Sequence, residues 1–345
     1  MIFRRTTQVL AIAGLSNIAC LAHAQSTVTA YGIMDATIRY AGNVAANGAS
    51  RKSIGDGAYT GSRLGFRGTE DLGDGMKAFF NSEMGLDPST GTLQQATATP
   101  NYGQAAAPNG RAWGRVSLVG ITTAFGTVML GRQYTLAHEL SGRFQPQSNP
   151  NEAALSVLSG HHVARQDNMA KYTNKFGPVG IAISATAGEG ANGKAWGAAG
   201  TYTAGPIDAV LYGQHMESFN GAETRKIYGL GGSCAVNSGL KLFLGGMQRS
   251  HEVSLQKNRV WTAGANYNLT SNLVLTASYT QDKQTGTGVG SRKLAFVGAD
   301  YLFSKRTDVY AVIDNNKLSG AYPLPGFMGT RDSATGVSVG LRHRF

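Results

Sequence analysis

Short runs of alternating apolar and polar residues recur about sixteen times along this chain. A period of two is the pattern of a β-strand with one apolar and one polar face. Roughly ten-residue segments of this kind, separated by turns, are typical of a β-barrel that spans a membrane. The predicted strands are 26–40, 58–69, 75–86, 111–121, 126–134, 165–175, 178–188, 194–204, 206–217, 224–235, 239–250, 258–269, 272–282, 291–302, 306–317 and 335–345.

The links between the predicted strands alternate between short and long. The short links are 70–75, 122–126, 176–178, 205–206, 237–239, 270–272 and 304–307. The long links are 41–57, 87–110, 135–164, 283–290 and 318–334, with shorter members near 189–193, 218–223 and 251–257. Short turns on the periplasmic rim and long loops on the external rim describe an outer-membrane barrel. Seven or eight of these strands would also fit a β-sandwich, which gives no reason for such segregation.

The two faces of the predicted strands differ in polarity. In 258–269, Trp261, Ala263 and Tyr267 share one face, and Thr262 and Asn266 share the other. Apolar residues outside and polar residues inside require a wet interior, which a small soluble barrel lacks. Tyrosines near strand ends would form an aromatic girdle at the membrane interface, although each could instead be a core aromatic of a soluble β protein. These tyrosines are Tyr267, Tyr279 and Tyr301.

The link 135–164 is the longest segment without a sustained period, and it is rich in Gln, Asn, Pro, Ser and His. A structureless insertion of this length in a compact protein is functional or disordered. We expect this loop to fold into the lumen of the barrel and to narrow it.

The N-terminus has the features of a signal peptide. Arg4 and Arg5 precede an apolar centre over 9–22, and Ala-His-Ala at 22–24 forms a small-residue cleavage site. Cleavage would leave 25–345 as one barrel domain of 321 residues with a formal charge of +9. Cys234 would then be the sole cysteine, which excludes an internal disulfide.

The composition narrows the class of protein further. The 47 glycines and 9 prolines favour many strands with tight turns over long helices. No run of about 18 apolar residues predicts a transmembrane helix. The basic surplus comes without a Lys/Arg run or a nucleic-acid module, so we expect no nucleic-acid partner.

The stretch 62–78 reads Ser-Arg-Leu-Gly-Phe-Arg-Gly-Thr-Glu-Asp-Leu-Gly-Asp-Gly-Met-Lys-Ala and resembles the trimeric general-diffusion porins of Gram-negative bacteria, in particular their beta-proteobacterial branch. Further matches follow in order over essentially the whole mature chain. They lie at 28–35, 113–115, 119–120, 125–128, 130–135, 165–168, 304–307 and 340–345.

The resemblance implies an all-β fold, a sixteen-stranded antiparallel transmembrane barrel in the outer membrane, with three barrels in a homotrimer and the third external loop folded inward. It also implies a ladder of wall arginines that faces acidic groups on this loop. Carried over to this chain, the arginines are Arg63, Arg115, Arg132 and Arg165, and the loop acids are Glu139 and Glu152. The chain lacks the Pro-Glu-Phe-Gly-Gly segment of some family members, which leaves the opposing carboxylate open.

The strand pattern places two of these arginines in the lumen. Arg63 faces inward if Leu64 and Phe66 face outward, and Arg115 faces inward if Val116 faces lipid. Both lie about 15–18 Å above the short-turn rim, and a lipid-facing arginine at that depth costs roughly 2–4 kcal/mol.

The other two arginines need local adjustments. Arg132 shares its parity with Val128 and Leu130, so a lumen position requires a bulge where the strand enters the loop. Arg165 lies about eleven residues from its turn, so strand stagger must bring it level with the others. The alternative for all four is a set of partnered wall charges that rigidify the barrel without contacting solutes.

Other motifs carry little chemistry. The glycine-rich segment 188–195 lacks the Ser/Thr of a phosphate-binding loop and opens no helical pattern, which favours a hairpin loop. We expect His161 and His162 to be a solvated pair, because adjacent residues of extended backbone point in opposite directions. No metal, cofactor or catalytic motif stands out.

The sequence therefore predicts a non-enzymatic, water-filled outer-membrane channel for small hydrophilic solutes and ions, with anion preference. A substrate-specific channel, a barrel hydrolase and a soluble secreted adhesin are the alternatives.

Overall fold

The computed structural model describes residues 27–42, 44–45, 47–96, 110–188 and 193–345, so the expected signal peptide lies outside the described residues. Within them, eighteen strands form one continuous antiparallel sheet. They are β1 (Thr27–Gly42), β2 (Arg51–Asp56), β3 (Arg63–Gly73), β4 (Met76–Leu86), β5 (Leu93–Gln94), β6 (Val116–Thr123), β7 (Gly126–Tyr134), β8 (Arg165–Phe176), β9 (Val179–Thr186), β10 (Ala195–Ala204), β11 (Ile207–Glu217), β12 (Thr224–Ala235), β13 (Leu240–His251), β14 (Lys257–Asn268), β15 (Leu273–Thr285), β16 (Gly290–Leu302), β17 (Thr307–Gly320) and β18 (Ser333–Arg344).

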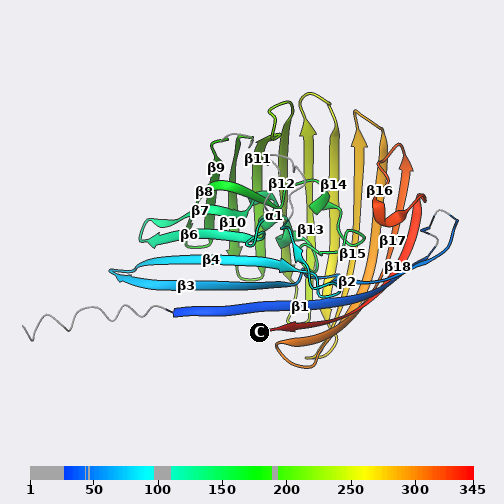
Figure 1. Ribbon diagram of the computed structural model, residues 1–345, viewed down its shortest axis with the longest axis horizontal. Coiled ribbons are helices and arrows are strands. Elements are labelled where there is room, and N and C mark those ends of the chain that lie inside the picture. Colours follow the sequence, from blue (N-terminus) through cyan, green and yellow to red (C-terminus); the bar gives the residue numbers. More distant parts are fainter. Residues whose placement is uncertain (1–26, 43, 46, 97–109, 189–192) are drawn as a thin grey trace, which may run out of the picture.

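The sheet closes into a barrel because β1 pairs with β18, with Ile33 opposite Arg344. The backbone of Phe345 continues this seam through two hydrogen bonds with Gly32, of 3.0 and 3.1 Å. In Figure 1, β1, β3 and β4 run across the view whereas β12–β17 stand nearly upright, as expected for strands that are tilted around a barrel.

The eighteen strands occupy sixteen positions in the wall, which confirms the predicted barrel. β2 and β3 both pair with β1, so they share one position, and β5 and β6 share another beside β4. Every predicted strand overlaps an observed one.

The second wall position is interrupted, which the sequence did not predict. Residues 57–62 leave the sheet between β2 and β3 where a continuous strand was expected from 58. Tyr59 from this interruption is 1% exposed and stacks on Tyr310 of β17, with ring centroids 4.4 Å apart. The Ala58 N–H donates to Tyr310 Oη over 2.8 Å. The interruption therefore lies inside the barrel, immediately before Arg63.

The outer face carries two levels of exposed aromatic side chains. Near the short-turn rim are Phe125, Phe176, Tyr202, Tyr267, Tyr301 and Phe303. Near the long-loop rim are Tyr40, Trp196, Tyr228 and Trp261. Exposed Ile, Leu, Val and Ala lie between the two levels, so the outer face has the aromatic girdles and apolar band of a membrane-spanning barrel. Among the described residues, no helix is long and apolar enough to cross a membrane.

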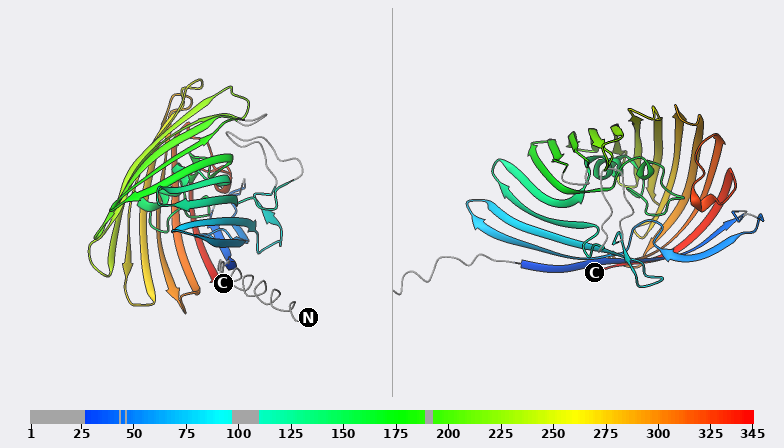
Figure 2. Two further views of the ribbon diagram at one scale, coloured as in Figure 1. Left: turned by 90° about the vertical axis from the view of Figure 1, so that its left-hand side faces the viewer. Right: turned by 45° about the horizontal axis from the view of Figure 1, so that its top comes forward.

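The loop 135–164 folds into the barrel, where Figure 2 shows its helices within the curved wall. It contains α1 (Leu136–Ser141), η1 (Gly142–Phe144) and η2 (Leu158–Gly160). Thr135 caps the N-terminus of α1. Its hydroxyl accepts a hydrogen bond from the His138 N–H, which satisfies an otherwise free donor of the first turn.

The loop packs against one side of the lumen through apolar side chains. Phe144 is fully buried over Gly231 and Gly245, which are register partners on β12 and β13. A cluster around this contact joins Leu140, Leu155 and Leu158 of the loop to inward-facing residues of β11–β14, β16 and β17. The polar inner faces that the strand pattern predicted therefore do not extend to this side of the lumen, where the inward-facing wall residues under the loop are apolar.

Candidate functional site

The loop leaves a cavity of about 460 Å³ on the opposite side of the lumen. Three of the four predicted arginines line it, namely Arg63, Arg115 and Arg165. The loop contributes mainly uncharged polar residues, and the interruption of the second wall position supplies Tyr59, Thr60 and Gly61. The loop residues are His138, Glu139, Gln147, Ser148, Asn149, Pro150, Asn151, Ser159 and Ala164.

Two of the arginines gather around a wall carboxylate, Glu83 of β4. Arg115 Nε lies 2.6 Å from Glu83 Oε1, and both side chains are buried. Arg63 Nη1 lies 3.9 Å from the same oxygen, while its Nε donates to the Gly61 carbonyl over 3.0 Å. Tyr31 donates its hydroxyl to Glu83 Oε2 over 3.0 Å. One carboxylate is thus shared by two guanidinium groups.

Tyr134, at the end of β7, connects the arginines to each other and to the loop. Its hydroxyl accepts from Arg115 Nη2 over 2.8 Å and from Arg165 Nη2 over 3.0 Å. The Arg165 guanidinium also lies 4.6 Å from the centre of the Tyr134 ring, a cation–π contact. Arg165 pairs with Tyr134 across β7 and β8, so the stagger of the strands does bring it level.

Arg132 occupies a separate position beside the cavity. The register shifts between Gly131 and Gln133, where the sequence required a bulge. The Arg132 side chain donates to the Gly114 carbonyl over 2.8 Å and forms an ion pair of 2.6 Å with Asp167. Arg111 binds the other oxygen of Asp167 at 2.8 Å. Arg132 therefore belongs to a second cluster and does not line the cavity.

The two predicted loop acids have different partners from those expected. Glu139 lines the cavity, but its carboxylate binds Lys171 of β8 at 2.9 Å. Glu152 binds Arg39 of β1 at 2.9 Å and accepts from Ser338 Oγ. The expectation that Glu152 faces the four arginines is corrected, because the loop crosses the lumen before it reaches this residue and anchors on the β1–β18 side.

His138 of the loop stacks on Tyr134 with centroids 5.1 Å apart. Its Nδ1 lies 3.0 Å from Nε2 of His162. Burial, together with Arg165, Arg115 and Arg63, lowers the pKa of His138 to about 3. The imidazole is therefore neutral near pH 7 and adds no charge to the cavity.

The histidine pair differs from the predicted solvated pair, because both rings are 5% exposed. They do point to different partners: His161 Nε2 lies 2.8 Å from Asp282 of β15, and His162 contacts His138. Burial lowers the pKa of both rings. No group of three or more potential metal-binding side chains occurs among the described residues.

Several residues of the site were missed in the sequence. Glu83 and Tyr31 face inward by strand parity, but nothing in their local pattern distinguishes them from other wall residues. Asp167 follows the matched Arg165 by two residues and could have been recognised as a partner for Arg132. Lys171 and Arg39 were identifiable only from the path of the loop.

Comparisons with known proteins agree with this geometry. The sequence profile of the Gram-negative porins matches residues 7–321. The chain belongs to the Gram-negative porin family. An outer membrane porin of Bordetella pertussis is 29% identical over 98% of this chain and 99% of its own length. Outer membrane porin protein 32 of Delftia acidovorans is 39% identical over 32% of this chain and 27% of its own length.

Among solved structures, the anion-selective porin from Comamonas acidovorans has 25% sequence identity and a TM-score of 0.75, over 93% of this chain and 100% of its own. As a member of the Gram-negative porin family, the chain with the present sequence is an outer-membrane channel rather than an enzyme. Its homologues include porins of the beta-proteobacterial branch. The predicted family, location and channel class are confirmed.

Proposed function

We propose that this porin is a general-diffusion channel for small hydrophilic solutes and ions, with a preference for anions. The observation that carries the proposal is the charge balance of one lumen wall. Among the described residues there, five arginines meet two carboxylates, Glu83 and Asp167. The arginines are Arg63, Arg111, Arg115, Arg132 and Arg165. Arginine stays protonated at any physiological pH, so this wall keeps an excess of positive charge.

The arrangement of the cavity supports an electrostatic field across the channel, from the arginines toward the loop. The arginine wall faces loop residues such as Ser148, Asn149 and Asn151, which carry no charge. A cationic wall in a water-filled channel raises the local concentration of anions and orients polar solutes. The similar porin from Comamonas acidovorans is described as anion-selective, which supports the same preference here.

We further propose that residues 1–24 are removed as a signal peptide, that 25–345 forms the barrel with 135–164 as its constriction loop, and that three copies associate. One of the similar structures, OmpT of Vibrio cholerae, is described in a trimer form. Native mass spectrometry of the purified porin should give the mass of three chains that begin at Gln25. A monomer, or a retained N-terminus, would refute the respective part.

The selectivity is tested by the reversal potential of planar bilayers under a KCl gradient. Wild-type channels should favour chloride, and Arg63→Ala should reduce that preference. One unit charge about 8 Å from the ion path in water is worth about 0.5 kcal/mol, roughly a twofold change in permeability ratio. Lys305→Ala, in the exposed turn between β16 and β17, removes the same charge far from the cavity and serves as the control. Cation preference in the wild type would reject the proposal.

A substrate-specific channel of the same architecture predicts a different result in these bilayers. Micromolar concentrations of one solute would then block the current in a saturable way. Current that falls only in proportion to solute size and concentration supports general diffusion.

A further inference from the structure

Four cationic side chains lie in a row on the outer face of four consecutive strands. Arg259 of β14, Lys283 of β15, Lys293 of β16 and Lys317 of β17 are all exposed and lie near the long-loop ends of their strands. We refer to them as the outer basic row. None of them lines the lumen, and the proposed channel function does not use them.

The row places like charges next to each other. Arg259 is directly opposite Lys283 across β14 and β15, and Lys293 is directly opposite Lys317 across β16 and β17. Like charges directly opposite on neighbouring strands destabilise a sheet. No carboxylate of the described residues forms an ion pair with any of the four, whereas Lys226 on β12 is paired with Glu252 at 2.5 Å. The positive charge of the outer basic row is therefore not neutralised by any carboxylate of the described residues.

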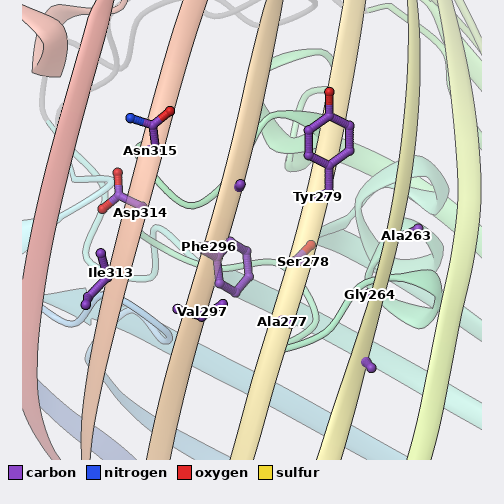
Figure 3. Close-up of a pocket in the computed structure, with 12 residues that line it drawn as sticks. Ala263, Gly264, Ala277, Ser278, Tyr279, Phe296, Val297, Ile313, Asp314 and Asn315 are labelled. Atoms are coloured by element: carbon purple, nitrogen blue, oxygen red, sulfur yellow. The ribbon is translucent and has the colours of Figure 1, made fainter.

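An apolar hollow lies on the same strands, on the membrane side of the row. It has a volume of about 540 Å³, and its outward-facing lining is mostly small, so the barrel surface is recessed there. Figure 3 shows Ala263, Ala277, Val297 and Ile313 spread across the four strands, with Tyr279 and Asn315 toward one end. A second hollow of about 530 Å³ continues it past Ala265, Ala299 and Ala311 toward Tyr267.

The order of residues along the strands matches the depth profile of a lipid. On β17 the outward residues run Lys317, Asn315, Ile313 and Ala311, from charged through polar to apolar. On β16 they run Lys293, Ala295, Val297 and Ala299. At about 3.3 Å per residue, six residues of tilted strand span roughly 15 Å, the length of an acyl chain segment.

We propose that this face binds a phosphorylated lipid of the outer leaflet, with its headgroup phosphate between the cations of the outer basic row and one acyl chain in the hollow. Directly opposed side chains on neighbouring strands have Cβ atoms about 5 Å apart, so one phosphate can accept charge-assisted hydrogen bonds from two of them. A free phosphate ion would use the row but not the hollow. A second copy of the porin would have to bury four cations against its own surface, which is unfavourable unless carboxylates match them.

The proposal is tested with the full-length porin in detergent micelles and diphosphorylated lipid A as the probe, with binding followed by native mass spectrometry. The Lys293→Gln/Lys317→Gln variant should bind the lipid about 25-fold more weakly, because each cation near an anionic lipid surface contributes roughly fivefold. The Lys305→Gln/Arg306→Gln variant loses the same charge in the exposed short turn and should bind as the wild type does. With dephosphorylated lipid A as the probe, the two variants should bind with the same affinity.

Four outcomes would overturn the proposal. Equal binding by the wild type and the Lys293/Lys317 variant would remove the row from lipid recognition. Equal affinity of the wild type for phosphorylated and dephosphorylated lipid would show that the headgroup is not recognised. A change of oligomeric state in lipid-free detergent, confined to the Lys293/Lys317 variant, would assign this face to a subunit contact. Competition by inorganic phosphate at the lipid's own concentration would contradict the role of the hollow.

Discussion

Arg115 and Glu83 are joined twice across the lumen wall. The Arg115 N–H donates to the Glu83 carbonyl over 3.0 Å, and the Arg115 guanidinium lies 2.6 Å from the Glu83 carboxylate. Arg63 approaches the same carboxylate at 3.9 Å. The carboxylate therefore holds the arginines in place and at the same time offsets part of their charge.

Replacement of this carboxylate should strengthen anion selectivity. Glu83→Gln keeps an acceptor for Arg115 but removes one negative charge, so the chloride-to-potassium permeability ratio should rise roughly twofold. Reversal potentials in planar bilayers measure it. Glu70→Gln, near the exposed short turn after β3, is the matched control. An unchanged ratio in Glu83→Gln would mean that ions pass out of reach of this wall.

A methyl group added to the wall under the loop, at Gly245 of β13, should narrow the channel. The Cβ of Gly245→Ala would overlap the ring of Phe144, which lies between the wall and the rest of the loop. We expect a lower single-channel conductance and a loss of stability of about 1–3 kcal/mol from overpacking. Gly200→Ala, whose Cβ meets nothing within 4 Å, is the control.

A second substitution separates displacement of the loop from damage to the barrel. In Gly245→Ala/Phe144→Gly no side-chain atom of residue 144 remains to overlap the new methyl group, so the conductance should return to the wild-type value or exceed it. A conductance that stays low in the double variant would contradict the steric explanation.

The external loops 218–223 and 251–256 are joined by Glu223, and this contact should be sensitive to acid. Its carboxylate accepts from the N–H groups of Glu252, Val253 and Ser254 at 2.8–2.9 Å. Burial raises the pKa of Glu223, but hydrogen bonds from the backbone N–H groups of Val253, Ser254 and Thr224 outweigh it and lower this pKa to about 2 from 4.5. A lowered carboxyl pKa means that the contact is fully formed above about pH 4.5 and is lost as the pH falls toward 2.

Hydrogen exchange measures that contact. The amides of 252–254 should be protected at pH 7 in the wild type and should exchange faster in Glu223→Gln. The difference between the two proteins should disappear near pH 2. Equal exchange at pH 7 would show that the carboxylate does not hold the loop.

His138 should not change the ion selectivity of the channel in mild acid. Because its pKa is lowered to about 3, the ring gains no proton between pH 8 and pH 5. The unfolded loop does take up that proton near pH 6.5, so the folded loop loses stability as the pH falls from 6.5 toward 3. Reversal potentials should stay constant from pH 8 to pH 5 in the wild type and in His138→Gln. A step near pH 6.5 that is absent from the variant would be inconsistent with this pKa.

The strands and the bounds of the loop were predictable because both depend on local pattern. Alternation fixes which side chains face outward, and the absence of any period in 135–164 marks the loop. The interruption at 57–62 was not predictable, since Tyr59 within it packs on Tyr310, which lies far away in the sequence.

The candidate site was predictable to a smaller extent. Strand parity placed Arg63 correctly, because Phe66 on the same strand faces outward. Arg115 also lines the cavity, but the reason given for it was wrong: Val116 is buried opposite Glu83 and does not face lipid, and Arg115 lies just before β6 begins. The partners of the charged groups were not predictable, because Glu83, Lys171 and Arg39 come from other strands and meet their partners only when the barrel is closed. The same holds for His161 and His162, whose burial depends on the opposite wall.

The seam between β1 and β18 has a consequence for how the molecule is made. It joins the first strand to the last, with Gly32 hydrogen-bonded to Phe345. The barrel therefore cannot close until the whole chain has reached the membrane. Until that moment two sheet edges are open and ready to pair with other chains. Assembly therefore depends on protection of these two edges until the chain reaches the membrane. Loss of the C-terminal strand would leave a gap in the barrel wall and would not produce a smaller closed barrel.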